Sequence, residues 1–136
     1  MLPQAARLKH KSDFNRVYGK GRSYPTDLVV MYVAPSRSET TRVGFSISSK
    51  VGKSVVRNRT RRLLREAVRL LLPRIKQNYD IVIVAKKKAA EADFDEICSA
   101  VEKLFRRAGL LGSAAESRRR ADSAEGGAVA SGSSSQ

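Results

Sequence analysis

Hydrophobic residues recur along the chain at two different spacings, which predict helices alternating with strands. Over residues 55–72 the apolar positions keep helical spacing until Pro73, whose missing N–H would interrupt a helix. At about 100° per residue, one side of this helix carries a set of residues that we expect to face the core. These are Val56, Thr60, Leu63, Leu64, Ala67, Leu70 and Leu71. A second helical spacing covers 94–108, and Asp93 followed by Glu96 predicts a capping box at its start.

Shorter stretches complete the predicted domain. Residues 28–34 and 80–85 are rich in β-branched side chains, and the second lacks alternation, which predicts a strand buried on both faces. Residues 42–48 alternate between apolar and small polar positions, which predicts a half-buried strand. Ser12 is placed to cap a short helix that ends at Gly19 and Gly21. The predicted order is helix, two or more strands, helix, strand, helix.

The composition changes near the end of the chain. From Gly112 onward the sequence is rich in Ser, Ala and Gly, with almost no residues that can bury area. We therefore expect one domain over 1–111 and a disordered tail over 112–136. The tail is electrically neutral, so the net charge of +14 belongs to 1–111. Such a charge predicts a polyanionic partner, either nucleic acid or an acidic membrane surface.

Several kinds of protein do not fit this sequence. No apolar run approaches the roughly 20 residues that span a bilayer, and the N-terminus lacks a secretory pattern, so we expect a cytoplasmic protein without a transmembrane segment. One Cys and one His cannot form an internal disulfide or a Cys/His zinc site. The acidic cluster at Asp93, Asp95 and Glu96 is explained by helix capping. We therefore expect no catalytic residue and no metal site in the chain.

The side of the 55–72 helix opposite its apolar positions is cationic. Ten basic residues stand against one acid between Lys50 and Lys76. Like charges one turn apart repel by a few tenths of a kcal/mol per pair, which predicts neutralisation by an external polyanion. The bias towards Arg favours phosphate, which a guanidinium binds with two parallel hydrogen bonds. The alternative is an ordinary solvated basic face.

Three aromatic residues have two possible roles. Phe14 and Tyr18 lie four positions apart on one helical face, and Tyr32 lies in a predicted strand. They could be core residues, or they could form a stacking surface for unpaired bases, worth about 1–3 kcal/mol per base. Composition does not decide between these roles.

Two adjoining segments carry a resemblance to a known family. Residues 42–48 read Arg-Val-Gly-Phe-Ser-Ile-Ser, and residues 50–66 read Lys-Val-Gly-Lys-Ser-Val-Val-Arg-Asn-Arg-Thr-Arg-Arg-Leu-Leu-Arg-Glu. Together they resemble the signature of the protein subunit of bacterial ribonuclease P, and the likeness extends from about Leu2 to Leu111. It implies an α+β fold, an α-β-β-β-α-β-α two-layer sandwich of the ribosomal-protein-like type with a left-handed crossover.

The resemblance also implies a function and a division of labour. The chain would be a subunit of a ribonucleoprotein endoribonuclease that removes the 5′ leader of precursor tRNA, with cleavage performed by the catalytic RNA. Its partners would be that RNA and precursor tRNA, with no membrane and no obligate protein partner. Mg²⁺ would be bound mainly by RNA in the holoenzyme and not by this chain alone.

Residues at matching positions are assigned by the same resemblance. The leader cleft would comprise Phe14, Tyr18, Val30, Tyr32 and Ser46, with Lys50 and Arg57 at its edge. The face for the catalytic RNA would comprise Lys53, Asn58, Arg59, Arg61, Arg62, Arg65 and Arg69. Two positions depart from the family pattern, since Ser54 replaces a common Ala and Tyr18 replaces a frequent Phe.

Two other functions share part of this pattern. A ribosomal or rRNA-binding structural protein would have the same charge and size but would need no stacking cleft. A DNA-binding regulator fits less well, because the basic residues span about half of the helix circumference, whereas groove readers present a few polar side chains to base edges.

Overall fold

The computed structural model describes residues 4–36 and 38–112, and its elements follow the implied α-β-β-β-α-β-α order. The helices and strands are α1 (Lys11–Lys20), β1 (Arg22–Pro25), β2 (Val29–Pro35), β3 (Arg42–Ser46), α2 (Ser54–Leu71), β4 (Tyr79–Ala85) and α3 (Phe94–Arg107). Short 3-10 turns are η1 (Gln4–Ala6), η2 (Ser49–Val51), η3 (Leu72–Arg74) and η4 (Lys87–Glu91). The expected tail lies outside the described residues except for Gly112, whose N–H donates to the Arg74 carbonyl at 2.7 Å.

The four strands form one mixed sheet in the order β1-β2-β4-β3. β2 is antiparallel to β1 and to β4, whereas β3 and β4 are parallel and are connected through α2. A parallel pair needs such a crossover, because its strands begin at the same end of the sheet. β4 has a strand on each side and is buried along most of its length, which confirms the prediction for residues 80–85.

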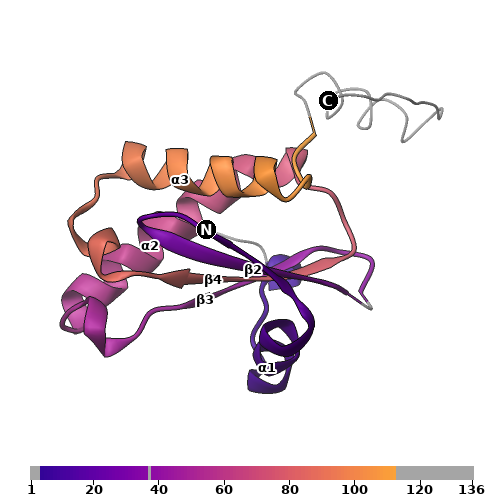
Figure 1. Ribbon diagram of the computed structural model, residues 1–136, viewed down its shortest axis with the longest axis horizontal. Coiled ribbons are helices and arrows are strands. Elements are labelled where there is room, and N and C mark those ends of the chain that lie inside the picture. Colours follow the sequence, from indigo (N-terminus) through magenta and orange to yellow (C-terminus); the bar gives the residue numbers. More distant parts are fainter. Residues whose placement is uncertain (1–3, 37, 113–136) are drawn as a thin grey trace.

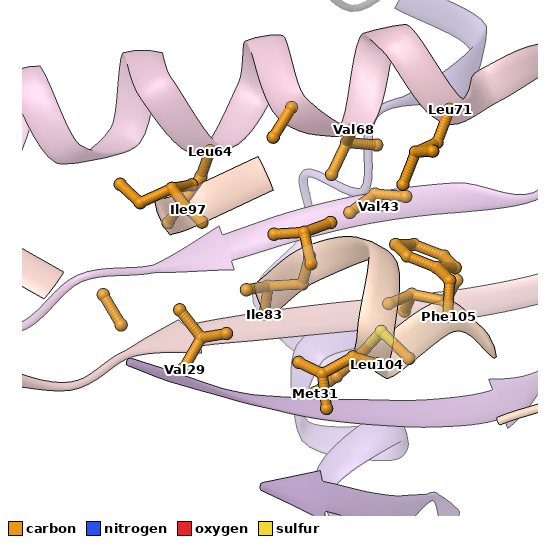
Figure 2. Packing of buried hydrophobic residues seen from close by; sticks show 14 of the residues in the cluster. Val29, Met31, Val43, Leu64, Val68, Leu71, Ile83, Ile97, Leu104 and Phe105 are labelled. Carbon is orange, nitrogen blue, oxygen red and sulfur yellow. The ribbon is translucent and has the colours of Figure 1, made fainter. Parts of the chain in front are cut away.

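Helices cover both faces of the sheet, but unequally. α2 and α3 lie together over one face, and α1 lies against the other (Figure 1). The main core fills the space under α2 and α3, where Met31, Ile83, Leu64 and Phe105 are fully buried (Figure 2). A smaller cluster of Leu8, Val17, Ala34 and Val82 lies on the α1 side.

The N-terminal segment continues the sheet beyond β3. Arg7 forms an isolated parallel bridge with Val43, and the Leu8 N–H donates to the Val43 carbonyl at 3.1 Å. Because β3 is an edge strand, this segment satisfies backbone groups that would otherwise face solvent. The basic segment thereby comes to lie beside the sheet.

Two assignments on the long helix differ from the prediction. Leu70 is 52% exposed, whereas Val68, which was not assigned to the core, is fully buried. Leu70 lies about 100° around the helix from Leu71 and so falls outside the arc that the sheet and α3 cover. The buried arc of α2 is therefore rotated towards Val68 and away from Leu70, which apolar character alone does not show.

The predicted ends of the shorter elements also need correction. Ser12 is not an N-cap, because α1 begins at Lys11 with His10 in the capping position and no side-chain cap. β3 ends at Ser46, because the chain then turns into η2, where the Ser48 hydroxyl accepts from the Lys50 N–H at 3.3 Å. β3 is also covered on both faces rather than one, since Gly44 is buried beneath Phe14.

The predicted capping box of α3 is confirmed. The Asp93 carboxylate accepts from the Glu96 N–H at 2.8 Å, and the Glu96 carboxylate accepts from the Asp93 N–H at 2.9 Å. This reciprocal pair satisfies backbone donors at the start of the helix. The acidic residues there have a structural role of the expected kind.

Candidate nucleic-acid interface

α1 places aromatic side chains over the sheet face opposite the main core. Val17 is the one residue of α1 that is fully buried, and Phe14 lies half-buried beside it. Tyr18 is 39% exposed, and its ring meets that of Tyr32 edge to face, with centroids 5.1 Å apart and planes at 85°. The three aromatic side chains therefore pack on the sheet and remain partly exposed to solvent.

The register of the strands brings the other expected leader residues to this same face. Val84 of β4 pairs with Val30 of β2 on one side and with Ser46 of β3 on the other. Alternation along β2 places Val30 and Tyr32 on one face. All of these side chains are half-buried. We call Phe14, Tyr18, Val30, Tyr32 and Ser46 the aromatic surface.

Val84 belongs to the aromatic surface by position, but the sequence did not single it out. Residues 80–85 are uniformly apolar after Asp80, so the strand gives no signal of which side chains face outward. Side chains alternate between the two faces of a strand, but which face Val84 shares with the leader residues follows only once the neighbouring strands are known.

Lys50 and Arg57 lie where η2 leads into α2. Lys50 is exposed, and the Arg57 Nε donates to the Gly52 carbonyl at 3.1 Å. Gly52 has φ 156° and ψ −170°, a conformation available essentially to glycine alone. The glycine thus permits the turn whose carbonyl the Arg57 side chain binds.

Three further lysines, Lys86, Lys87 and Lys88, follow β4 and are exposed. The Lys86 N–H donates to the Leu28 carbonyl at 2.8 Å, which extends the pairing of β4 with the chain before β2. η4, which begins at Lys87, packs against η2. These lysines lie outside the predicted site residues, although a run of lysines directly after a buried strand is a signal visible in the sequence.

The residues assigned to the catalytic RNA are spread around α2. We call Lys53, Asn58, Arg59, Arg61, Arg62, Arg65 and Arg69 the cationic face. Arg61 and Arg65 lie on the flank next to β3, whereas Arg59 lies on the opposite flank and donates to the carbonyls of Ala90 and Ala92 at 3.4 and 3.3 Å. Asn58, Arg62 and Arg69 are exposed on the ridge between the flanks. The structure therefore presents a broad cationic ridge rather than one compact cluster.

Two arginines of the cationic face have partners on the helix itself. Arg69 binds the Glu66 carboxylate, with its Nε 3.0 and 3.1 Å from the two oxygens. Arg61 donates to the Asn58 side-chain oxygen at 3.2 Å. An exposed ion pair of this kind contributes little, so Arg69 can exchange Glu66 for a phosphate at small cost.

A pocket of about 310 Å³ opens beside α2. Its lining combines cationic and apolar side chains, namely Arg7, Leu8, Lys9, Phe14, Val43, Gly44, Phe45, Arg61 and Arg65. Burial lowers the pKa of Arg65, and the neighbouring charges of Arg61 and Arg7 lower it further. The positive potential is therefore concentrated there, as binding of an anion requires.

Arg7 and Lys9 belong to a basic N-terminal segment and lie outside the predicted site residues. They line the pocket because residues 7 and 8 pair with β3. Nothing in the sequence indicates that pairing. Their positive charge is visible in the sequence, but their location beside the pocket follows only from the structure.

A buried ion cluster anchors α1 to the sheet. Asp80 of β4 is 0% exposed and accepts from Arg42 of β3, with Nε–Oδ1 at 3.0 Å and Nη2–Oδ2 at 2.8 Å. Arg16 of α1 also binds Asp80. Burial alone would raise the pKa of Asp80, but hydrogen bonds from Arg42, Ser36 and Arg16 outweigh it and lower the pKa below its ordinary value. Asp80 is thus held as a carboxylate.

Metal ligands do not gather anywhere in the described part of the chain. Across residues 4–36 and 38–112, no group of three or more His, Cys, Asp or Glu side chains could hold a metal ion. No helix within these ranges is both long and apolar enough to cross a membrane.

Comparison with known proteins gives a consistent family. The family model described as Ribonuclease P matches residues 2–109. The ribonuclease P protein component of Symbiobacterium thermophilum is 49% identical over 111 residues, covering 81% of this chain and 96% of that protein. That of Caldanaerobacter subterraneus subsp. tengcongensis is 44% identical over 110 residues, covering 81% of this chain and 95% of that protein.

Solved structures of the family share the fold. The ribonuclease P protein of Staphylococcus aureus superposes with a TM-score of 0.74 at 29% identity, covering 80% of this chain and 100% of that one. The protein from Thermotoga maritima gives a TM-score of 0.67 at 28% identity, covering 74% and 96%.

The fold and the interface together define a small, basic α+β protein of the nucleic-acid-binding class. Its sheet carries partly exposed aromatic residues on one face and a cationic helix over the other. The chain belongs to the family of bacterial ribonuclease P protein components. As a member of that family it is a subunit of an endoribonuclease that processes tRNA.

Proposed function

We propose that the chain binds the catalytic RNA of ribonuclease P through its cationic face and the 5′ leader of precursor tRNA through its aromatic surface. In doing so it assists removal of the leader to give the mature 5′ end. The observation that carries the proposal is the pocket beside α2, whose lining includes Phe14 from the aromatic surface together with Arg61 and Arg65 from the cationic face. The two surfaces are therefore contiguous, so two RNA segments bound to them would converge.

Each surface suits a different RNA structure. Side chains cannot read the deep, narrow major groove of an RNA helix, so a folded RNA is contacted mainly through phosphates and 2′-hydroxyls, for which exposed arginines are suited. An unpaired strand offers base faces that stack on aromatic rings, whatever the base. The half-buried rings of Phe14 and Tyr32 and the exposed ring of Tyr18 are available for that contact.

Cleavage itself is assigned to the catalytic RNA and its Mg²⁺. The described residues supply no metal-binding cluster, and the paired role of Asp93 and Glu96 at the start of α3 is structural. Mg²⁺ held by the RNA would supply charge neutralisation and would activate the attacking water at the scissile phosphate. The chain neutralises phosphates where substrate and catalyst meet, which lowers their repulsion and should reduce the Mg²⁺ concentration that cleavage requires.

The proposal is tested by varying leader length. We expect that a leader of several nucleotides strengthens binding of precursor tRNA only when the protein is present, and that Phe14→Ala removes most of this gain. Phe94→Ala is the matched control, since Phe94 is also half-buried but lies at the start of α3. A complex whose affinity does not depend on the leader would instead favour a ribosomal or rRNA-binding structural role.

A second measurement addresses the cationic contribution to catalysis. Cleavage of precursor tRNA by the cognate RNA is followed over a Mg²⁺ titration with and without the chain. The expected result is a lower Mg²⁺ requirement in its presence. An unchanged requirement would remove this part of the mechanism, and cleavage by the chain alone would contradict the assignment of the chemistry to RNA.

A further inference from the structure

α1 has a small apolar attachment to the sheet for a helix that carries two of the five residues of the aromatic surface. Of its ten residues, Val17 is the one that is buried, in a small cluster with Leu8, Ala34 and Val82. Such a contact resists separation, but it defines orientation poorly, because the hydrophobic effect has no preferred direction. Polar contacts of α1, which are directional, are therefore needed to fix its angle over the sheet.

The ion cluster supplies directional contacts from three strands. Asp80 of β4 receives two hydrogen bonds from Arg42 of β3 and one from Arg16 of α1. The second amino group of Arg16 donates to the Pro35 carbonyl at the end of β2, at 3.1 Å. Asp13 of α1 lies 3.9 Å from Arg16 and 3.8 Å from Arg42, which closes the cluster.

The position of these contacts on α1 links them to the aromatic side chains. In the sequence, Arg16 stands midway between Phe14 and Tyr18, and Asp13 directly precedes Phe14. A ten-residue helix moves as one body, so a rotation permitted at Arg16 would carry both rings with it. The edge-to-face contact of Tyr18 with Tyr32 depends on the same angle.

We propose that Asp80 is a positioning residue for the 5′ leader, which acts by fixing α1 through Arg16 and Arg42 so that Phe14 and Tyr18 face the sheet. The inference rests on the proposed function of the aromatic surface. A buried ion cluster contributes less net stability than its contacts suggest, because desolvation opposes the attraction. Its main effect here is orientation, so its loss reduces leader binding more than it reduces binding of the catalytic RNA.

The test measures a leader increment, which is the ratio of dissociation constants for precursor tRNA with a minimal and with a longer leader. It uses the holoenzyme assembled with the cognate RNA, under conditions that prevent cleavage. Asp80→Asn keeps the side-chain volume and removes the charge. If the correctly docked population of α1 falls to about a tenth, the increment falls about tenfold. Affinity of the protein for the catalytic RNA is expected to stay within about twofold of wild type.

Arg16→Gln is the second variant, and it carries the test should Asp80→Asn fail to fold. Its matched control is Arg74→Gln, because Arg74 is also half-buried and its Nε donates to a backbone carbonyl, that of Gly112, at 2.9 Å. We expect Arg16→Gln to lower the increment and Arg74→Gln to preserve it. Equal effects of the two arginine variants would show a general loss of stability and would overturn the proposal.

Coupling to Tyr18 separates positioning from a purely structural role. If Asp80 acts through α1, then Asp80→Asn adds little to the loss already caused by Tyr18→Ala, whereas independent effects would multiply. Amide hydrogen exchange should also rise in α1 but not in α3. A wild-type protein without any leader increment would refute the proposed function itself. A normal wild-type increment that persists in Asp80→Asn and Arg16→Gln would refute only this positioning role.

Discussion

Gly44 lies at a point of close approach between the sheet and α1, and adding a single methyl group there tests the packing of Phe14. A Cβ at Gly44 would lie 2.4 Å from the Phe14 Cζ and 2.9 Å from its Cε1. Carbon atoms in contact are about 3.5–4.0 Å apart, so the ring has to retreat by at least about 1 Å. We expect Gly44→Ala to displace Phe14 rather than the backbone of β3.

The magnitude follows from two opposing effects. Overpacking of a filled site costs about 1–3 kcal/mol, while replacing Gly by Ala within a strand recovers about 0.5–1 kcal/mol of backbone entropy. The expected net loss in the free energy of unfolding is therefore about 0–2.5 kcal/mol. In a Phe14→Ala background the ring carbons are absent and the nearest remaining contact is the Leu8 Cβ at 3.1 Å. There the same substitution should be about neutral or slightly stabilising.

Urea unfolding of the free chain, followed by circular dichroism, measures all four members of this cycle. Gly19→Ala is the matched control, since a Cβ at Gly19 meets nothing within 4 Å. It should stabilise α1 by up to about 1 kcal/mol, in both backgrounds alike. If the effect of Gly44→Ala is the same within about 0.5 kcal/mol with and without Phe14, the packing argument is wrong.

Three other predictions concern backbone strain, acid stability and salt dependence. Gly52→Ala should cost about 1–3 kcal/mol in urea unfolding, because φ is 156° and the new Cβ would lie 3.0 Å from Val56. The lowered pKa of Asp80 means that its stabilisation is complete above the ordinary carboxyl pKa and is lost as pH falls through the folded value. The free energy of unfolding should therefore fall more steeply below about pH 4 in wild type than in Asp80→Asn. Arg65→Ala should flatten the salt dependence of holoenzyme assembly by about 0.7–0.9 log units per log salt, one phosphate contact.

Controls sharpen these three measurements. A Gly52→Ala protein of unchanged stability would show that the turn before α2 can adopt an ordinary conformation. Parallel acid titrations of wild type and Asp80→Asn would mean that other carboxylates govern the acid transition. Arg106→Ala removes an exposed arginine on α3 that pairs with Glu102, and it should leave the salt slope unchanged. A slope altered equally by Arg65→Ala and Arg106→Ala would contradict a localised cationic face.

The elements with strong local signals were predictable from the sequence. The long helix, the uniformly apolar strand at 80–85 and the capping box at Asp93 each depend on residues close together in the chain. β1 was not visible in the hydrophobic pattern, because its four residues are mostly exposed and end at Pro25. Its existence followed only from the family resemblance.

The environment of the candidate site depends on contacts that are distant in sequence. The sequence does not determine whether Phe14 is a core or a surface residue, because its exposure is set by the docking of α1. That docking uses Arg16 and Asp80, which are 64 positions apart. The pocket likewise joins Arg7 with Arg65 through a backbone pairing that no residue pattern indicates. The sequence therefore indicates which side chains could bind RNA, whereas only the fold shows which of them lie together.

The bridge between Arg7 and Val43 has a practical consequence for handling the protein. β3 borders the sheet, and an uncovered border strand can recruit a strand from another molecule and so start aggregation. A truncation that removes residues 7 and 8, or a bulky tag fused next to them, would uncover the backbone of Val43. Preparations altered in this way should therefore precipitate more readily than those tagged at the opposite end.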